Sequence, residues 1–107
     1  MANIGDVTDA EFQESVLEST TPVLVDFWAE WCVPCHMVSP VVEELGTEKG
    51  ESLKVAKLDI DANPQSTRTY GVMSIPALIL FKDGQEVARV IGAKPKEQIL
   101  RELGTHL

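Results

Sequence analysis

Residues 21–36 of the chain read TPVLVDFWAEWCVPCH. The first nine residues are a short apolar run with β-branched and aromatic side chains, which predicts a buried strand. Beyond the cysteines, apolar residues recur at helical spacing, although Pro40 should kink this helix because proline removes a backbone donor and clashes with the preceding turn. Cys32 and Cys35 therefore lie where a strand ends and a helix begins.

The other predicted elements alternate between helices and strands. They are a helix over 7–19, a strand over 52–60, a helix over 63–71, strands over 77–82 and 86–92, a last helix after Pro95, and room for a short strand near 3–7. Asp83-Gly84, between the last two strands, is a strong hairpin signal. Strands that alternate with helices pair in parallel and the hairpin adds an antiparallel pair, so we expect an α/β fold with a mixed sheet.

Two of these predicted helices have residues typical of helix ends. Thr8, followed three residues later by Glu11, is the pattern of a capping box. In the short helix, Asn63 is expected as the N-cap, Pro64 lies in the first turn and Gly71 follows the end. The sequence therefore predicts where both helices begin.

Composition limits the function classes. The 107 residues, 44% of them hydrophobic, suit one domain over 1–107. Two cysteines are too few for a disulfide framework or a four-cysteine metal site, and the histidines do not match zinc-finger spacing. With 17 acidic and 9 basic residues, the net charge of −8 argues against a nucleic-acid partner.

We also expect no membrane association. The N-terminal residues lack a signal-peptide pattern, and the longest apolar runs are too short to span a bilayer. The protein is therefore predicted to be a monomer in the cytoplasm, or in an organelle after removal of a leader that this chain does not include.

The cysteine pair at the helix start predicts redox chemistry. The helix N-terminus favours negative charge and so stabilises a thiolate, the form that attacks disulfides. Three residues along a helix bring the second sulfur close to the first. We expect Cys32 to be exposed and to act as the nucleophile, and Cys35 to be shielded and to act as the resolving thiol. Two ordinary buried cysteines are the alternative, which the strand-to-helix junction disfavours.

Cys32-x-x-Cys35-His36 also has the spacing that attaches a c-type haem, with His36 on the iron and Met37 or Met73 as the other axial ligand. The buried strand before the cysteines, and an apolar pattern that fills an α/β core, argue against this electron carrier. A redox-silent binding module is a third alternative, which the two intact cysteines argue against.

Asp26 lies inside the predicted core strand. Burial should raise the pKa of its carboxyl unless another group pairs with it. Lys57 lies similarly inside the strand over 52–60, and the two strands could be neighbours. From these residues alone, a non-catalytic role, as a buried ion pair or an Asp at a local bulge, and a role as an acid–base group near the cysteines remain equally open.

Pro76, in the stretch SIPA, directly precedes a strand. About one X–Pro bond in twenty is cis in folded proteins, so both a cis and a trans Ile75–Pro76 bond remain open on the residues alone. The two tryptophans are predicted to lie in different environments. Trp28 is expected in the core, and Trp31 is expected to be a surface contact beside Cys32.

Four stretches, DFWAEWCVPC, KLDID, YGVMSIPALILFKDG and GAKP, resemble the thioredoxin family in order and spacing over nearly the whole chain. The resemblance implies a thioredoxin fold, a central mixed sheet of about five strands flanked by four helices. It also implies a protein-disulfide reductase that binds no cofactor and cycles between a Cys32/Cys35 dithiol and a redox-active disulfide. Its partners would be protein substrates with exposed disulfides and a thioredoxin reductase that draws on NADPH or ferredoxin.

The resemblance also assigns roles. Cys32 matches the nucleophile and Cys35 the resolving cysteine, while Asp26 and Lys57 match a buried acid and its partner that assist proton transfer to and from Cys35. Pro76 matches a cis-proline that faces the dithiol. The residues expected to contact or line the docking surface for an extended substrate peptide are Trp31, Val33, Pro34, Val72, Ser74, Ile75, Pro76, Gly92 and Ala93.

Three positions depart from the family pattern. Val33 replaces the usual glycine, His36 replaces lysine or arginine, and Ala77 replaces threonine. Val33 stiffens the loop between the cysteines, where residues tune the redox potential. His36 replaces a constant charge with one that titrates near neutrality.

Overall fold

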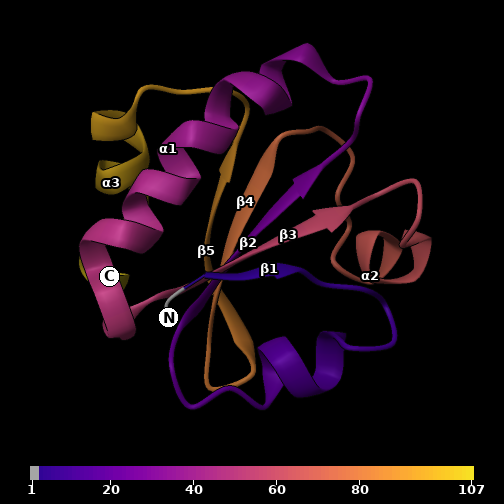
Figure 1. The fold of residues 1–107 in the computed structure, drawn as a ribbon, viewed down its shortest axis with the longest axis horizontal. Coiled ribbons are helices and arrows are strands. Elements are labelled where there is room, and N and C mark those ends of the chain that lie inside the picture. Colours follow the sequence, from indigo (N-terminus) through magenta and orange to yellow (C-terminus); the bar gives the residue numbers. More distant parts are fainter. Residues whose placement is uncertain (1–2) are drawn as a thin grey trace.

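A five-stranded mixed β-sheet forms the centre of the computed structural model, which describes residues 3–107 (Figure 1). The strands are β1 (Asn3–Asp6), β2 (Val23–Trp28), β3 (Lys54–Asp59), β4 (Ala77–Lys82) and β5 (Gln85–Ile91), in the spatial order β1-β3-β2-β4-β5. The strands β1, β3 and β2 pair in parallel, whereas β4 is antiparallel to both β2 and β5. The predicted mixed sheet is confirmed, including the short strand near the N-terminus.

Helices cover both faces of the sheet (Figure 1). They are α1 (Val33–Lys49), α2 (Pro64–Thr69), α3 (Lys96–Leu103), the π-helical turn η1 (Gln13–Leu17), and the 3-10 turns η2 (Gly50–Ser52) and η3 (Gly104–His106). On one face, α1 and α3 bury Val38, Val42 and Ile99 in a cluster that includes Leu24 of β2. On the other face, Phe12 and Val16 pack against the opposite side of β2. Successive side chains of β2 therefore alternate between the core layers on the two faces of the sheet.

The first helix is shorter than predicted and differs in type. The carboxylate of Glu11 accepts hydrogen bonds from the Thr8 backbone N–H at 3.2 Å and from its hydroxyl at 3.0 Å, so one of the two contacts of a capping box is present, but the N-cap of the helical segment is Phe12. The helical segment that follows, however, is the five-residue π-helix η1 rather than an α-helix over 7–19.

The N-terminus of α2 is capped from a distant part of the chain. Asn63 occupies the N-cap position as predicted, but its side chain makes no capping hydrogen bond within the helix. Instead the carboxylate of Asp9 accepts from the backbone N–H groups of Gln65 (3.1 Å) and Ser66 (2.8 Å), while the Asn63 amide oxygen accepts from the Asp9 N–H (2.8 Å). These bonds satisfy free helix donors and anchor α2 to the segment before η1.

The turn between β4 and β5 matches its signal. Asp83 and Gly84 both have positive φ, 52° and 80°, as expected for the turn type that suits the twist of a hairpin. A Cβ on Gly84 would lie 3.0 Å from the Leu17 carbonyl oxygen, so η1 packs against this turn. This is the end of the sheet where β2 begins, and it is opposite the cysteines, which follow the end of β2.

No helix within residues 3–107 has the combination of length and apolar character that crossing a membrane requires.

Candidate redox site

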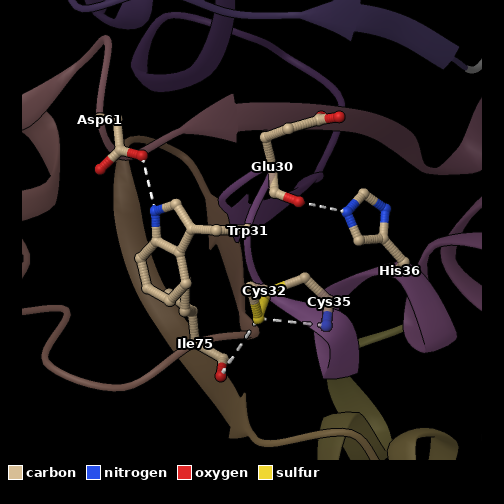
Figure 2. The surroundings of a disulfide bond; sticks show 7 residues. All are labelled: Glu30, Trp31, Cys32, Cys35, His36, Asp61 and Ile75. Atoms are coloured by element: carbon tan, nitrogen blue, oxygen red, sulfur yellow. Dashed lines mark hydrogen bonds between the residues drawn. A yellow bond between two sulfur atoms is a disulfide. The ribbon is translucent and has the colours of Figure 1, made fainter.

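The site begins where β2 ends and α1 starts. Cys32 is the N-cap of α1, and its Sγ accepts a hydrogen bond from the Cys35 backbone N–H at 3.2 Å. Cys32 and Cys35 are joined by a disulfide, with their Cα atoms 5.3 Å apart (Figure 2). The predicted junction therefore places both sulfurs at the positive end of a seventeen-residue helix.

The predicted exposure of Cys32 is wrong for this disulfide form. Only 4% of Cys32 and 1% of Cys35 is exposed. At the helix end, the two cysteines and Ala29 form a small cluster, and the partly buried Trp28, Ile60 and Ile75 pack against it. A molecule that approaches the oxidised protein therefore touches the surrounding side chains before it touches sulfur.

The loop that precedes β4 faces the disulfide. The Ile75–Pro76 peptide bond is cis, and the Ile75 carbonyl oxygen lies 3.9 Å from Cys32 Sγ (Figure 2). The cis bond confirms the expectation taken from the family resemblance. Ser74 is exposed on the same loop, whereas Pro76 is buried.

Sheet pairing brings the other predicted docking residues to this edge. Phe27, at the end of β2, pairs with Ala77 at the start of β4, which in turn pairs with Ile91 at the end of β5. The Gly92 N–H then donates to the Pro76 carbonyl at 2.8 Å, so the segment that carries Gly92 and Ala93 lies against the cis-proline loop.

The docking predictions differ in how exposed the side chains are. Trp31, Val33, Pro34 and Ala93 are exposed beside the disulfide, but Val72 is partly buried against the core. Ala77, the third departure from the family pattern, is fully buried in the core layer that contains Phe27, so a hydroxyl at this position would need a partner there.

Trp31 is held in place by a residue that sequence reasoning missed. Its indole Nε1–H donates to the Asp61 carboxylate at 2.8 Å (Figure 2). Asp59 accepts the Asp61 N–H at 2.9 Å and so shapes the turn that carries Asp61. The two aspartates of KLDID were the available signal, but only the fold shows that the turn after β3 reaches Trp31.

His36 is tied to the loop before the cysteines. Its Nε2 is 2.7 Å from the Glu30 carbonyl oxygen, a geometry in which the ring N–H donates (Figure 2). The imidazole also packs edge-on to Trp28, with ring centroids 5.9 Å apart. His36 is thus engaged within the loop rather than presented for the axial position that the haem alternative required, and both sulfurs are used in the disulfide.

Asp26 and Lys57 are direct neighbours in the parallel β2–β3 register, as the sequence suggested. Asp26 is fully buried, and neither carboxylate oxygen has a hydrogen-bond partner among the described residues. Lys57 instead donates to the Ser39 hydroxyl at 2.8 Å and lies 4.6 Å from the centroid of the Trp28 ring. Burial raises the pKa of Asp26 to about 7, although the positive charge of Lys57 lowers it in part.

Asp26 points toward the helix that carries the cysteines. Strand alternation puts its side chain on the same face of β2 as Leu24, which packs against Val38 and Val42 of α1. Ser39 of α1 reaches Lys57 on that face as well. Asp26, Lys57 and the first turns of α1 therefore share one partly polar layer beneath the disulfide.

A disulfide at the start of a helix, preceded by a central buried strand and faced by a cis-proline loop, defines a thiol–disulfide oxidoreductase. The model of the thioredoxin family matches residues 3–105. The chain therefore belongs to the thioredoxin family.

Individual relatives agree with this assignment. The chain is 62% identical over 97 residues to the thioredoxin of Mycobacterium tuberculosis (strain ATCC 25618 / H37Rv), covering 91% of this chain and 84% of that protein. It is 49% identical over 107 residues to thioredoxin 1 of Nostoc sp. (strain PCC 7120 / SAG 25.82 / UTEX 2576), covering 100% of both. It is also 56% identical over 98 residues to the bifunctional thioredoxin reductase/thioredoxin of Mycobacterium leprae (strain TN), covering 92% of this chain and 21% of that protein.

The burial of Asp26 predicts a pH-dependent stability difference for Asp26→Asn. The pKa of Asp26 is about 7 in the fold against an ordinary value of 3.8, so the folded protein binds more protons than the unfolded chain between these values. Wild-type stability therefore falls as the pH rises from about 4 through about 7, whereas the amide has no proton to lose. We expect the oxidised variant to match wild type near pH 4 and to be more stable by roughly 2–4 kcal/mol at pH 8.

Urea unfolding at pH 4, 6 and 8 measures this difference. Asp83→Asn, in the exposed hairpin turn, is the control for a general effect of removing one negative charge. A stability gain for Asp26→Asn that is the same at all three pH values would contradict a raised pKa.

Proposed function

We propose that the protein reduces protein disulfides with Cys32 as the nucleophile and Cys35 as the resolving thiol. The observation that carries this proposal is the Cys32–Cys35 disulfide at the N-terminus of α1, with the Ile75 carbonyl oxygen beside it. In the reduced protein, the Cys35 N–H and the helix dipole would stabilise a Cys32 thiolate.

The reaction balances in two exchange steps. The Cys32 thiolate attacks one sulfur of a substrate disulfide, so a mixed disulfide forms and the other substrate sulfur leaves as a thiolate. Cys35, having lost its proton, then attacks the Cys32 sulfur, which forms the Cys32–Cys35 bond and releases the second substrate thiol. The protein ends oxidised by two electrons and needs a reductant to begin again.

Asp26 is proposed to accept the Cys35 proton. Its fully buried carboxyl lies on the α1 side of β2, and its pKa of about 7 lets it take up and release a proton near neutrality. Lys57 would adjust that balance through its charge, and Ser39 holds the lysine in place.

The substrate is proposed to dock on the exposed side chains around the disulfide. Trp31, Val33, Pro34 and Ala93 offer apolar contact, and the backbone of Ser74 and Ile75 would bind an extended peptide. Gly92 lies against Pro76 and continues this surface, while the partly buried Val72 supports it from beneath.

The reductant is proposed to be a thioredoxin reductase. The name of the Mycobacterium leprae relative joins a thioredoxin reductase and a thioredoxin in one protein, which supports this pairing. We further infer a monomer in the cytoplasm. The net charge of −8 opposes self-association, and both cysteines serve one redox pair, so none is left for the structural disulfides typical of oxidising compartments.

Cys35→Ser is expected to trap substrates covalently, because the mixed disulfide on Cys32 then has no resolving thiol. The measurement is non-reducing electrophoresis and mass spectrometry of adducts formed with an oxidised protein such as insulin. Cys32→Ser is the matched control and should trap none, because it lacks the thiol that is proposed to attack the substrate disulfide. Equal trapping by both variants, or none by Cys35→Ser, would overturn the assigned order of attack.

Asp26→Asn is expected to slow disulfide reduction by roughly tenfold or more, since the variant cannot accept the Cys35 proton. Insulin reduction by the dithiol form, followed from pH 6 to 9, measures the rate, and circular dichroism checks the fold. Asp83→Asn again serves as the control and should keep the wild-type rate. A rate for Asp26→Asn that equals wild type across this range removes Asp26 from the mechanism.

His36→Lys is expected to make Cys32 more reactive than His36→Gln does, because lysine places a permanent positive charge beside the cysteine pair, which favours the thiolate. The measurement is the rate of alkylation of the reduced protein by iodoacetamide against pH. His36→Gln separates charge from position, since its amide can still donate to the Glu30 carbonyl. Equal alkylation rates for the lysine and glutamine variants at every pH would refute a role for charge at position 36.

A further inference from the structure

Exposed apolar side chains gather at the redox edge. Among the residues whose exposure is described, 5–107, the large hydrophobic side chains that remain exposed are Trp31, Val33, Met37, Met73 and Ile91. Met73 is 95% exposed and Trp31 66% exposed. All five lie beside the cysteines, on the loop before Pro76, or at the end of β5 that pairs with the start of β4.

This apolar face extends along α1. A hollow of about 300 Å³ lies between the first turns of α1 and the segment after β5, lined by Met37, Val38, Val41, Ala93, Lys94 and Pro95. Apolar contact of this kind strengthens docking but is not directional, so it does not distinguish one extended peptide from another.

The charges at the same edge are negative. The exposed carboxylates of Glu30 and Asp61 belong to the chain directly before Trp31 and to the turn that holds its indole. Figure 2 shows both residues above the disulfide in that view, together with Trp31. A peptide that packs on Trp31 therefore passes close to Asp61, and one that extends from Trp31 toward His36 also passes Glu30, whose side chain points to that side in Figure 2.

Two lysines of this region have contacts with other residues of the chain. Lys57 is half-buried, donates to Ser39 and lies against Trp28. Lys94, which follows Ala93, forms an ion pair with Glu102 at 3.0 Å. Among the described residues, neither lysine forms an ion pair with Glu30 or Asp61, and the net charge of −8 adds a negative field at longer range.

We propose that this face selects target disulfides that are flanked by lysine or arginine, with Glu30 and Asp61 as the selecting groups. The proposal rests on the proposed function and names the substrate class of that same surface. A basic side chain beside the target cysteine gains attraction to two carboxylates, whereas an acidic side chain is repelled by them.

Three disulfide peptides that differ only in a lysine, glutamine or glutamate two residues from the target cysteine test this selection. The rate constant of each with the reduced protein at pH 8 is divided by its rate constant with dithiothreitol, which corrects for the effect of the flanking charge on the leaving thiol. We expect the corrected rate for the lysine peptide to exceed that for the glutamate peptide by roughly threefold to tenfold at low salt, and the ratio to approach one at high salt.

The variants Glu30→Gln and Asp61→Asn should each lower this ratio at low salt, because each removes one of the carboxylates that attract the lysine peptide and repel the glutamate peptide. Asparagine keeps an acceptor for the Trp31 indole, so this change removes charge without removing the hydrogen bond. Glu14→Gln is the matched control, because η1 lies at the opposite end of the sheet, and it should keep the wild-type ratio.

Each result decides the proposal. Equal corrected rates for the lysine and glutamate peptides overturn the selection while leaving the proposed function intact. A ratio that survives both carboxylate variants overturns the assignment to Glu30 and Asp61. Failure to reduce any of the three peptides would overturn the proposed function itself, and the selection with it.

Discussion

The fixed start of α1 at the end of β2 is the constraint on which the site depends. β2 is the middle strand, paired with β3 on one side and β4 on the other, and the side chains from Val23 to Phe27 are fully buried. Its last residues cannot shift without breaking both pairings, and α1 is held on the sheet by Val38 and Val42. The N-cap position of Cys32 follows from this packing. Because β4 begins and β5 ends at the same edge, the cis-proline loop is brought opposite the disulfide by the sheet itself.

The same pairing imposes a cost at Asp26. A carboxyl in the middle strand loses its hydration, and in this fold it gains no hydrogen bond among the described residues, because Lys57 donates to Ser39 instead. The apolar neighbours that bury Asp26 stabilise the fold enough to tolerate this loss. What the loss provides is a group with a pKa of about 7 on the face of the sheet covered by α1. If the Asp26 carboxyl were hydrated, the fold would be more stable at neutral pH. Its pKa would then lie near the ordinary value, and the group would no longer exchange protons near neutrality.

The sequence predicted features that depend on neighbouring residues, and it missed those that depend on distant ones. The strand-to-helix junction at Cys32, the hairpin at Asp83-Gly84 and the end of α2 at Gly71 follow from local patterns. The sequence suggested that the strands of Asp26 and Lys57 could be neighbours, because each of these charged residues lies inside a predicted core strand, but the register that pairs them comes from the fold. By contrast, Asp9 caps α2 from more than fifty residues away, and Asp61 reaches Trp31 only once the sheet has formed. The burial of Cys32 was missed because the three side chains that pack against its cluster come from three separate segments.

His36 and Val33 show how the site can vary while its geometry stays fixed. The hydrogen bond of His36 goes to the backbone carbonyl of Glu30, so it does not depend on the side chain at position 30. Other residues with an N–H donor at position 36 could make the same contact with a different charge. Val33 is exposed at the first turn of α1 and takes no part in sheet pairing, so its bulk alters the surface that a substrate meets rather than the position of the sulfurs. Charge and shape at this rim are therefore free to change the potential and the choice of substrate, because the sheet beneath, and not the rim, positions the disulfide.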